Sequence, residues 1–212
     1  LGILTNKPLQ AYTEGHLKLF FIYNKADADF VKGHMYKFMM EGWHGIVNKK
    51  QKDAKPLIEY INQQFSFDAA KQTSFIDNNT IFEEVKEQLD KFSLDPGCTY
   101  VAIYISPIKN DDKDHPQHKA YYQIKEHLLD KGITSQVIFK EHLAKPEFYY
   151  FLPNIYVALL AKMGGIPWRL ARSRANELII GVGAFKPRDA AHRYVGSAFC
   201  FSNDGKFEGF GC

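Results

Sequence analysis

The run CTYVAIYISP, residues 98 to 107, constrains the fold more than any other stretch of the chain. It is an almost unbroken series of β-branched and aromatic residues closed by proline, a pattern typical of a strand buried on both faces. A helix is predicted over residues 120 to 131, ended by Gly132, and a further strand over residues 134 to 139. Together they form a βαβ unit, so the sequence predicts a Rossmann-like α/β domain whose ligands bind at the carboxyl ends of the strands.

The flanking segments extend this pattern and then change it. A strand is predicted at residues 16 to 24 and helices at 26 to 42, 81 to 94 and 151 to 163, whereas KKQKDAKP, residues 49 to 56, is expected to be a charged connector. From residue 177 onward the pattern is one strand followed by a hairpin. We therefore predict one domain over residues 1–172 and the start of a second over residues 173–212.

Composition narrows the classes of protein to consider. The 212 residues are 45% hydrophobic, and their formal charge of +3 is too small for binding nucleic acid by bulk attraction, so any basic site must be local. Three cysteines without a CxxC spacing argue against a disulfide framework or a cysteine zinc site and favour the cytoplasm. The chain has no apolar run of membrane-spanning length, and it lacks the GxGxxG and P-loop patterns.

Four polar residues on neighbouring predicted elements form the main candidate site. Tyr121 and Lys125 share a helix face, Gln136 lies early in the next strand, and Lys162 ends the following helix. Each alone has an ordinary explanation, because helix faces are solvated and lysine is favoured at a helix C-terminus. Together they offer a ring for base stacking, two cations and an amide, the chemistry that a nucleic-acid 5′ phosphate requires.

The same residues carry a family resemblance. The series Tyr121, Lys125, Gln136 and Lys162 resembles the tyrosine-lysine-glutamine-lysine motif of the MID domain in Argonaute proteins. The surrounding sequence is similar to prokaryotic Argonautes of the short, MID-PIWI class. The similar segments are YYQIKEHLLDKGITSQVI, LPNIYVALLAKMGGIPWRL and ELIIGVGAF. This resemblance covers residues 98–212 and is looser before them. It implies a MID domain followed by the first strands of an RNase H-like PIWI domain.

The resemblance implies roles for the individual residues. Tyr121 would stack on the first guide base, while Lys125, Gln136 and Lys162 would hold the 5′ phosphate together with Mg²⁺. The family's C-terminal carboxylate, which helps to hold that metal, has no counterpart in this chain, so no metal ligand is assigned. Residues 162 to 193 contain seven lysines and arginines against two acids, a run that is either a solvated face or a track for the guide backbone. The further guide contacts that we predict are Asn154, Arg169, Arg172 and Arg174.

One departure from the family pattern concerns catalysis. Argonautes that cut their target place a metal-binding aspartate on the first PIWI strand, two residues after the glycine of an IIGxD pattern. Here IIGVGAF puts Gly183 at that position, so a carboxylate needed for two-metal hydrolysis is absent. We therefore expect a protein that binds without cutting.

The predicted function is guide binding by a short, non-slicing prokaryotic Argonaute. The resemblance implies a small guide, expected to be RNA, and single-stranded DNA as the target. It also implies an associated effector, a TIR or sirtuin-like NAD-consuming enzyme joined to an APAZ domain, in defence against plasmids or phage. Two alternatives remain open at this point: an active guide-directed nuclease, and an α/β small-molecule enzyme or interaction module.

Overall fold

The structure is a computed structural model that describes residues 2–11, 15–109, 112, 114–169, 177–185, 195–203, 205 and 207–211, with Phe185 and Val195 described by their backbone alone. The chain divides into two compact units, Leu1–Pro167 and Trp168–Cys212.

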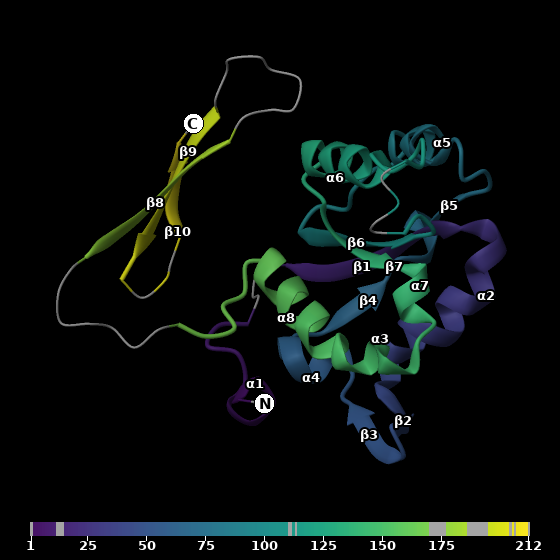
Figure 1. The fold of residues 1–212 in the computed structure, drawn as a ribbon, viewed down its shortest axis with the longest axis horizontal. Helices are drawn as coiled ribbons and strands as arrows, with labels where there is room; N and C mark the ends of the chain where they lie inside the picture. Colours follow the sequence, from purple (N-terminus) through teal and green to yellow (C-terminus); the bar gives the residue numbers. More distant parts are fainter. Residues whose placement is uncertain are drawn as a thin grey trace. The chain divides into compact units, whose positions relative to one another are not determined.

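A parallel sheet forms the centre of the first unit (Figure 1). Its strands lie in the order β4 (Phe65–Phe67), β1 (His16–Asn24), β6 (Cys98–Ser106) and β7 (Thr134–Phe139). Another short strand, β5 (Thr73–Phe75), pairs with β1 beyond the end of β4. All of these pairings are parallel, as the predicted βαβ unit requires, and the expected α/β class is confirmed.

Both faces of β1 and β6 are buried, which explains their continuous apolar sequences. On one face Val101 and Ile103 pack in a core with α4 (Leu57–Ile61) and α8 (Leu152–Lys162). On the other face Tyr100 and Ala102 pack against α5 (Ile81–Leu89) and α6 (Ala120–Asp130). Figure 1 shows α5 and α6 on one side of the sheet and α4 and α8 on the other.

The remaining helical segments of the first unit are short. α1 (Gly2–Asn6) precedes the sheet, and α7 (Lys140–Leu143) and the 3₁₀ helix η4 (Pro146–Tyr150) connect β7 to α8. The helix predicted over residues 26 to 42 is a composite, because a π-helical turn interrupts it. Its parts are η1 (Lys25–Asp27), α2 (Ala28–Val31), the π turn η2 (Lys32–Tyr36) and α3 (Lys37–Glu41), while η3 (Ala69–Lys71) lies between β4 and β5.

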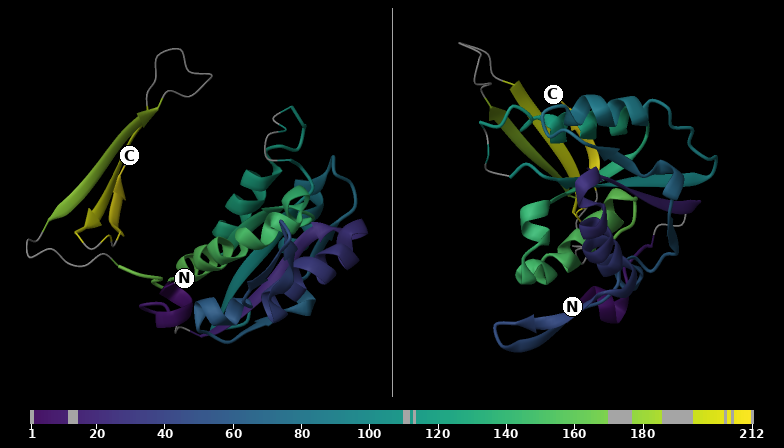
Figure 2. Two further views of the ribbon diagram at one scale, coloured as in Figure 1. Left: turned by 60° about the horizontal axis from the view of Figure 1, so that its bottom comes forward. Right: turned by 90° about the vertical axis from the view of Figure 1, so that its right-hand side faces the viewer.

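The charged connector predicted over residues 49 to 56 is wrong, because a β-hairpin occupies this region. β2 (Trp43–Val47) pairs antiparallel with β3 (Lys50–Ala54) through a turn in which Asn48 and Lys49 both have positive φ. The hairpin extends away from the central sheet (Figure 2), so its outward residues need not be apolar. Because β3 is largely exposed, its sequence is as polar as that of a loop.

The second unit contains a three-stranded antiparallel sheet. β9 (Val195–Ser202) lies between β8 (Leu178–Phe185) and β10 (Phe207–Gly211). The strand and hairpin predicted from residue 177 onward are therefore confirmed. Several large apolar side chains of these strands are exposed within the chain: Leu178, Ile179, Ile180, Val182, Phe199, Phe207 and Phe210.

Candidate functional site

The four residues of the predicted constellation lie around β7, which pairs on only one side among the described strands. Tyr121 and Lys125 lie in the first two turns of α6, Gln136 in β7, and Lys162 at the last position of α8. α6 and α8 cover opposite faces of the sheet, so their side chains meet around the open edge of β7. The four therefore lie along an edge strand rather than beyond the carboxyl ends of the strands.

Lys162 ties the end of α8 to β7. Its ammonium donates hydrogen bonds to the backbone oxygen of Ser135 and to Gln136 Oε1, the latter at 3.0 Å. The amide nitrogen of Gln136 in turn donates to the backbone oxygen of Val137 at 2.9 Å, which turns its own oxygen toward the lysine. A chain of hydrogen bonds thus fixes the orientation of the amide and the ammonium.

Lys125 brings a second positive charge to the same place. Its Nζ lies 6.0 Å from the centre of the half-buried Tyr121 ring, within reach of a cation–π interaction. Burial of the Lys162 ammonium and repulsion from Lys125 lower the pKa of Lys162 below its ordinary value. Among the described residues, neither lysine forms an ion pair with a carboxylate. Two neighbouring cations without an acidic partner form a site for an anion.

The oxygen atoms of this cluster do not by themselves fit Mg²⁺. Magnesium requires octahedral oxygen ligands, commonly carboxylates and phosphates. Here the Ser135 carbonyl and Gln136 Oε1 both accept from an ammonium, and two lysines repel a cation. In the part of the chain that the structure describes, no three His, Cys, Asp or Glu side chains gather as a metal site.

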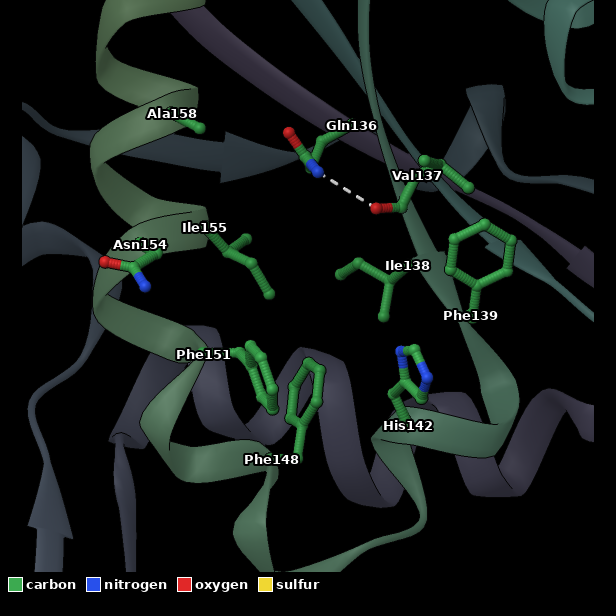
Figure 3. Close-up of a pocket in the computed structure, with 10 residues that line it drawn as sticks. All are labelled: Gln136, Val137, Ile138, Phe139, His142, Phe148, Phe151, Asn154, Ile155 and Ala158. Carbon is green, nitrogen blue, oxygen red and sulfur yellow. Dashed lines mark hydrogen bonds between the residues drawn. The ribbon is translucent and has the colours of Figure 1, made fainter. Parts of the chain in front are cut away.

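A pocket of about 260 Å³ adjoins the lysines and lies between β7 and α8 (Figure 3). Gln136 lines it on the β7 side and the exposed Asn154 on the α8 side, while Phe148 and Phe151 close one end. Sequence reasoning identified Gln136 and Asn154 but missed the aromatic wall, for which the dense aromatic run EFYYF at residues 147 to 151 was the available signal. The other lining residues are Val137, Ile138, Phe139, His142, Ile155 and Ala158.

None of the three predicted arginine contacts lies in the described part of the first unit, which holds the cluster. Arg169 is exposed and belongs to the second unit. Arg172 and Arg174 lie outside the described residues.

Gly183 lies in β8, opposite Ser197 of β9. A Cβ atom added at Gly183 would meet Ser197 Oγ at 3.7 Å, an ordinary van der Waals contact. The position therefore accepts a Cβ atom, although the sequence provides no carboxylate there.

None of the described helices is both long and apolar enough to cross a bilayer.

Comparison with known proteins identifies related sequences. The Piwi domain family matches residues 113–210. A Piwi protein of Archaeoglobus fulgidus is 25% identical over 134 residues, which cover 61% of this chain and 27% of that protein. An Argonaute protein of Cereibacter sphaeroides is 32% identical over 95 residues, or 41% of this chain and 12% of that protein.

The fold has relatives among solved structures as well. The Argonaute protein of Methanocaldococcus jannaschii superposes with a TM-score of 0.57 at 21% identity, over 96% of this chain and 26% of that one. This chain therefore covers 27%, 12% and 26%, respectively, of the length of these three related proteins.

Proposed function

We propose that this chain, whose residues 113–210 match the Piwi domain family and which is similar to Piwi and Argonaute proteins, anchors the 5′ phosphate of a small guide at Lys125 and Lys162. The observation that carries the proposal is the approach of these two ammonium groups, with Gln136 bonded to one of them and no carboxylate paired with either among the described residues. A terminal phosphate carries up to two negative charges and strong acceptor oxygens, which match this arrangement.

The hydrogen bonds within the site leave donors for such a ligand. An ammonium has three protons, and Lys162 directs bonds to two protein oxygens, so one proton remains. The Gln136 amide has two protons and uses one on Val137. Lys125 neutralises a further part of the phosphate charge, and the Tyr121 ring stacks on the first guide base. The first nucleotides then reach the adjoining pocket, where Asn154 donates to them.

In the proposed function, the protein binds its target without cutting it. Gly183 has no side chain with which to hold a catalytic metal ion, so guide and target remain paired and intact. Our proposal places the chain in a short prokaryotic Argonaute of the cytoplasm, with an RNA guide and single-stranded DNA as the target. A TIR-APAZ or sirtuin-like-APAZ effector supplies the enzymatic activity in defence against plasmids or phage.

A pair of guides that differ only at the 5′ end tests the anchor. Labelled RNA of one sequence is prepared with a 5′ phosphate and with a 5′ hydroxyl, and both are titrated at one fixed salt concentration. We expect the phosphorylated RNA to bind at least about tenfold more tightly, since a charged hydrogen bond contributes about 1.5 to 3 kcal/mol. Equal affinity would reject the anchor and favour an interaction module or a small-molecule enzyme.

A further inference from the structure

A second cavity, of about 610 Å³, lies on the first unit and shares no lining residue with the pocket between β7 and α8. One wall is the helical stretch from η2 to α3, another is β2, and residues 143 to 146, from the end of α7 to the start of η4, complete the lining. No residue of β3 lines it, so the groove follows the side of β2 that faces away from its partner strand. Its lining comprises Gly33, His34, Lys37, Phe38, Glu41, Gly42, Trp43, His44, Ile46, Leu143, Ala144, Lys145 and Pro146.

The hairpin leaves backbone groups of β2 directed toward this groove. The two positive φ values at Asn48 and Lys49 correspond to a type I′ turn, which closes on a hydrogen-bonded pair, here Val47 and Lys50. Bonded and non-bonded pairs then alternate along the ladder, so His44 and Ile46 direct their N–H and C=O groups away from β3. His44 and Ile46 line the groove, whereas Gly45 and Val47 do not.

The side chains of the groove combine an apolar floor with a mainly basic rim. Phe38, Trp43 and Leu143 supply apolar surface, and Trp43 is held by stacking on Tyr149 at 4.9 Å between ring centres. Lys145 lies on the exposed rim.

The rim also contains Lys37, His34 and a single acid, Glu41, whose carboxylate lies 3.9 Å from Lys37 Nζ. His44 is bonded to the Asp53 carboxylate at 2.9 Å, so Lys145 is the rim lysine without an ion pair among the described residues. His34 lies in the π-helical turn, a local geometry found frequently at functional sites.

From these observations we propose that the groove binds an extended, acidic segment of another protein, which adds to β2 as a third strand. An unpaired strand edge gives such a segment its main-chain hydrogen bonds, and alternate side chains enter the groove. Acidic residues on the segment complement Lys37 and Lys145, while apolar residues contact Phe38 and Trp43. The inference does not depend on the guide anchor, because the two sites share no residue.

The probe for this interaction is a fluorescein-labelled peptide of alternating glutamate and valine, nine residues long. Ile46→Pro removes the N–H that faces the groove but no bond of the hairpin, and we expect it to weaken peptide binding about tenfold, the equivalent of one backbone hydrogen bond. Gln51→Pro is the matched control, because Gln51 faces Ile46 across the ladder and directs its N–H to the opposite edge. This control is expected to bind within about twofold of the unmodified protein.

Amide exchange measured by NMR tests the geometry without any substitution. The bound peptide should slow exchange at His44 and Ile46 and leave Gly45 and Val47 nearly unchanged. Replacing Lys37 and Lys145 by glutamate should abolish the preference for this peptide over its lysine–valine counterpart.

Four results would overturn the proposal. In the first, the acidic peptide fails to bind at about millimolar concentration, and in the second, the two proline variants lose binding equally. In the third, a deoxythymidine decamer protects the same amides. In the fourth, the chain self-associates through β2. Neither the peptide titration nor the exchange measurement requires a guide, so failure of the anchor would leave their outcome unaffected.

Discussion

At the scale of single residues, Lys162 and Lys125 have different tasks although both are lysines. The ammonium of Lys162 is bonded to Ser135 and Gln136, so it contributes to the structure of the site before any ligand arrives. Lys125 lies over the Tyr121 ring, and a cation–π contact in a partly exposed position is weak. In the proposed site, Lys162 would therefore set the position of the phosphate and Lys125 would add positive charge.

Replacing either lysine by alanine should weaken binding of 5′-phosphorylated RNA by about 1.5 to 3 kcal/mol, the range for a charged hydrogen bond. Both variants should keep the circular dichroism of the unmodified chain. Lys91→Ala is a suitable control, because Lys91 is an exposed lysine on the α5 side whose ion pair is with Glu87. Unchanged affinity in both site variants, with the fold intact, would remove the site from consideration.

Tyr121 tests the stacking role by itself. Tyr121→Ala should reduce guide affinity by about 1 to 3 kcal/mol through loss of base stacking, whereas Tyr121→Phe keeps the ring and should lose less. Titration of the same phosphorylated RNA separates the two variants. Equal losses would assign the role to the hydroxyl group instead of the ring.

At the scale of secondary structure elements, the sequence predicts what is periodic or buried. β6 and α6 were predictable because nearly every residue of β6 is apolar and α6 repeats Ala120, Ile124 and Leu128 at four-residue spacing. β3 was not, since KQKDA lies in an exposed hairpin and its strand geometry comes from the turn before it. The hydrogen bond from Lys162 to the Ser135 carbonyl could not be predicted either, because every residue has a backbone carbonyl and the acceptor lies 27 residues away in the sequence.

Gly42, between α3 and β2, sets the hairpin in place. It has a φ of +83°, and a Cβ atom there would approach the Ala54 carbonyl oxygen to 2.4 Å. Gly42→Ala should therefore lower the free energy of unfolding by about 1 to 3 kcal/mol or more, from backbone strain and the collision. Gly33→Ala is the matched control: nothing lies within 4 Å of its added Cβ, and a helical alanine should stabilise by about 0.5 to 1 kcal/mol. Urea unfolding of both variants gives the comparison, and an unaffected Gly42→Ala protein would contradict this account.

At the scale of the whole molecule, binding and cutting have separate structural requirements. The anchor lies within the first unit, whereas Gly183 lies in the second. The proximity of Lys162 to Gln136 and Lys125 could be predicted from the βαβ pattern, whereas the role of the four residues stays a prediction. The aromatic wall of the pocket was not, because Phe148 and Phe151 meet Gln136 only through the chain reversal between β7 and α8.

The complete protein loaded with guide should leave a complementary DNA target uncut in magnesium or manganese. Gly183→Asp alone should not create cutting even though a Cβ atom is accepted beside Ser197, because one carboxylate cannot hold two metal ions. A time course on end-labelled target measures this. Discrete guide-dependent cleavage by the unmodified protein, abolished by chelation, would establish the nuclease alternative.

The bond between Lys162 and Ser135 joins segments that separate when the chain unfolds, so the anchor exists only in the folded state. A ligand that binds only the folded state raises its stability, by about 2.7 kcal/mol when its concentration is 100 times the dissociation constant. Thermal unfolding should therefore shift upward with 5′-phosphorylated RNA, and less with its 5′-hydroxyl counterpart at equal concentration. In a cell that degrades unfolded chains, this coupling lengthens the lifetime of loaded molecules relative to empty ones. On the proposed function, the guide would then act as a stabilising ligand that determines which copies of the protein persist.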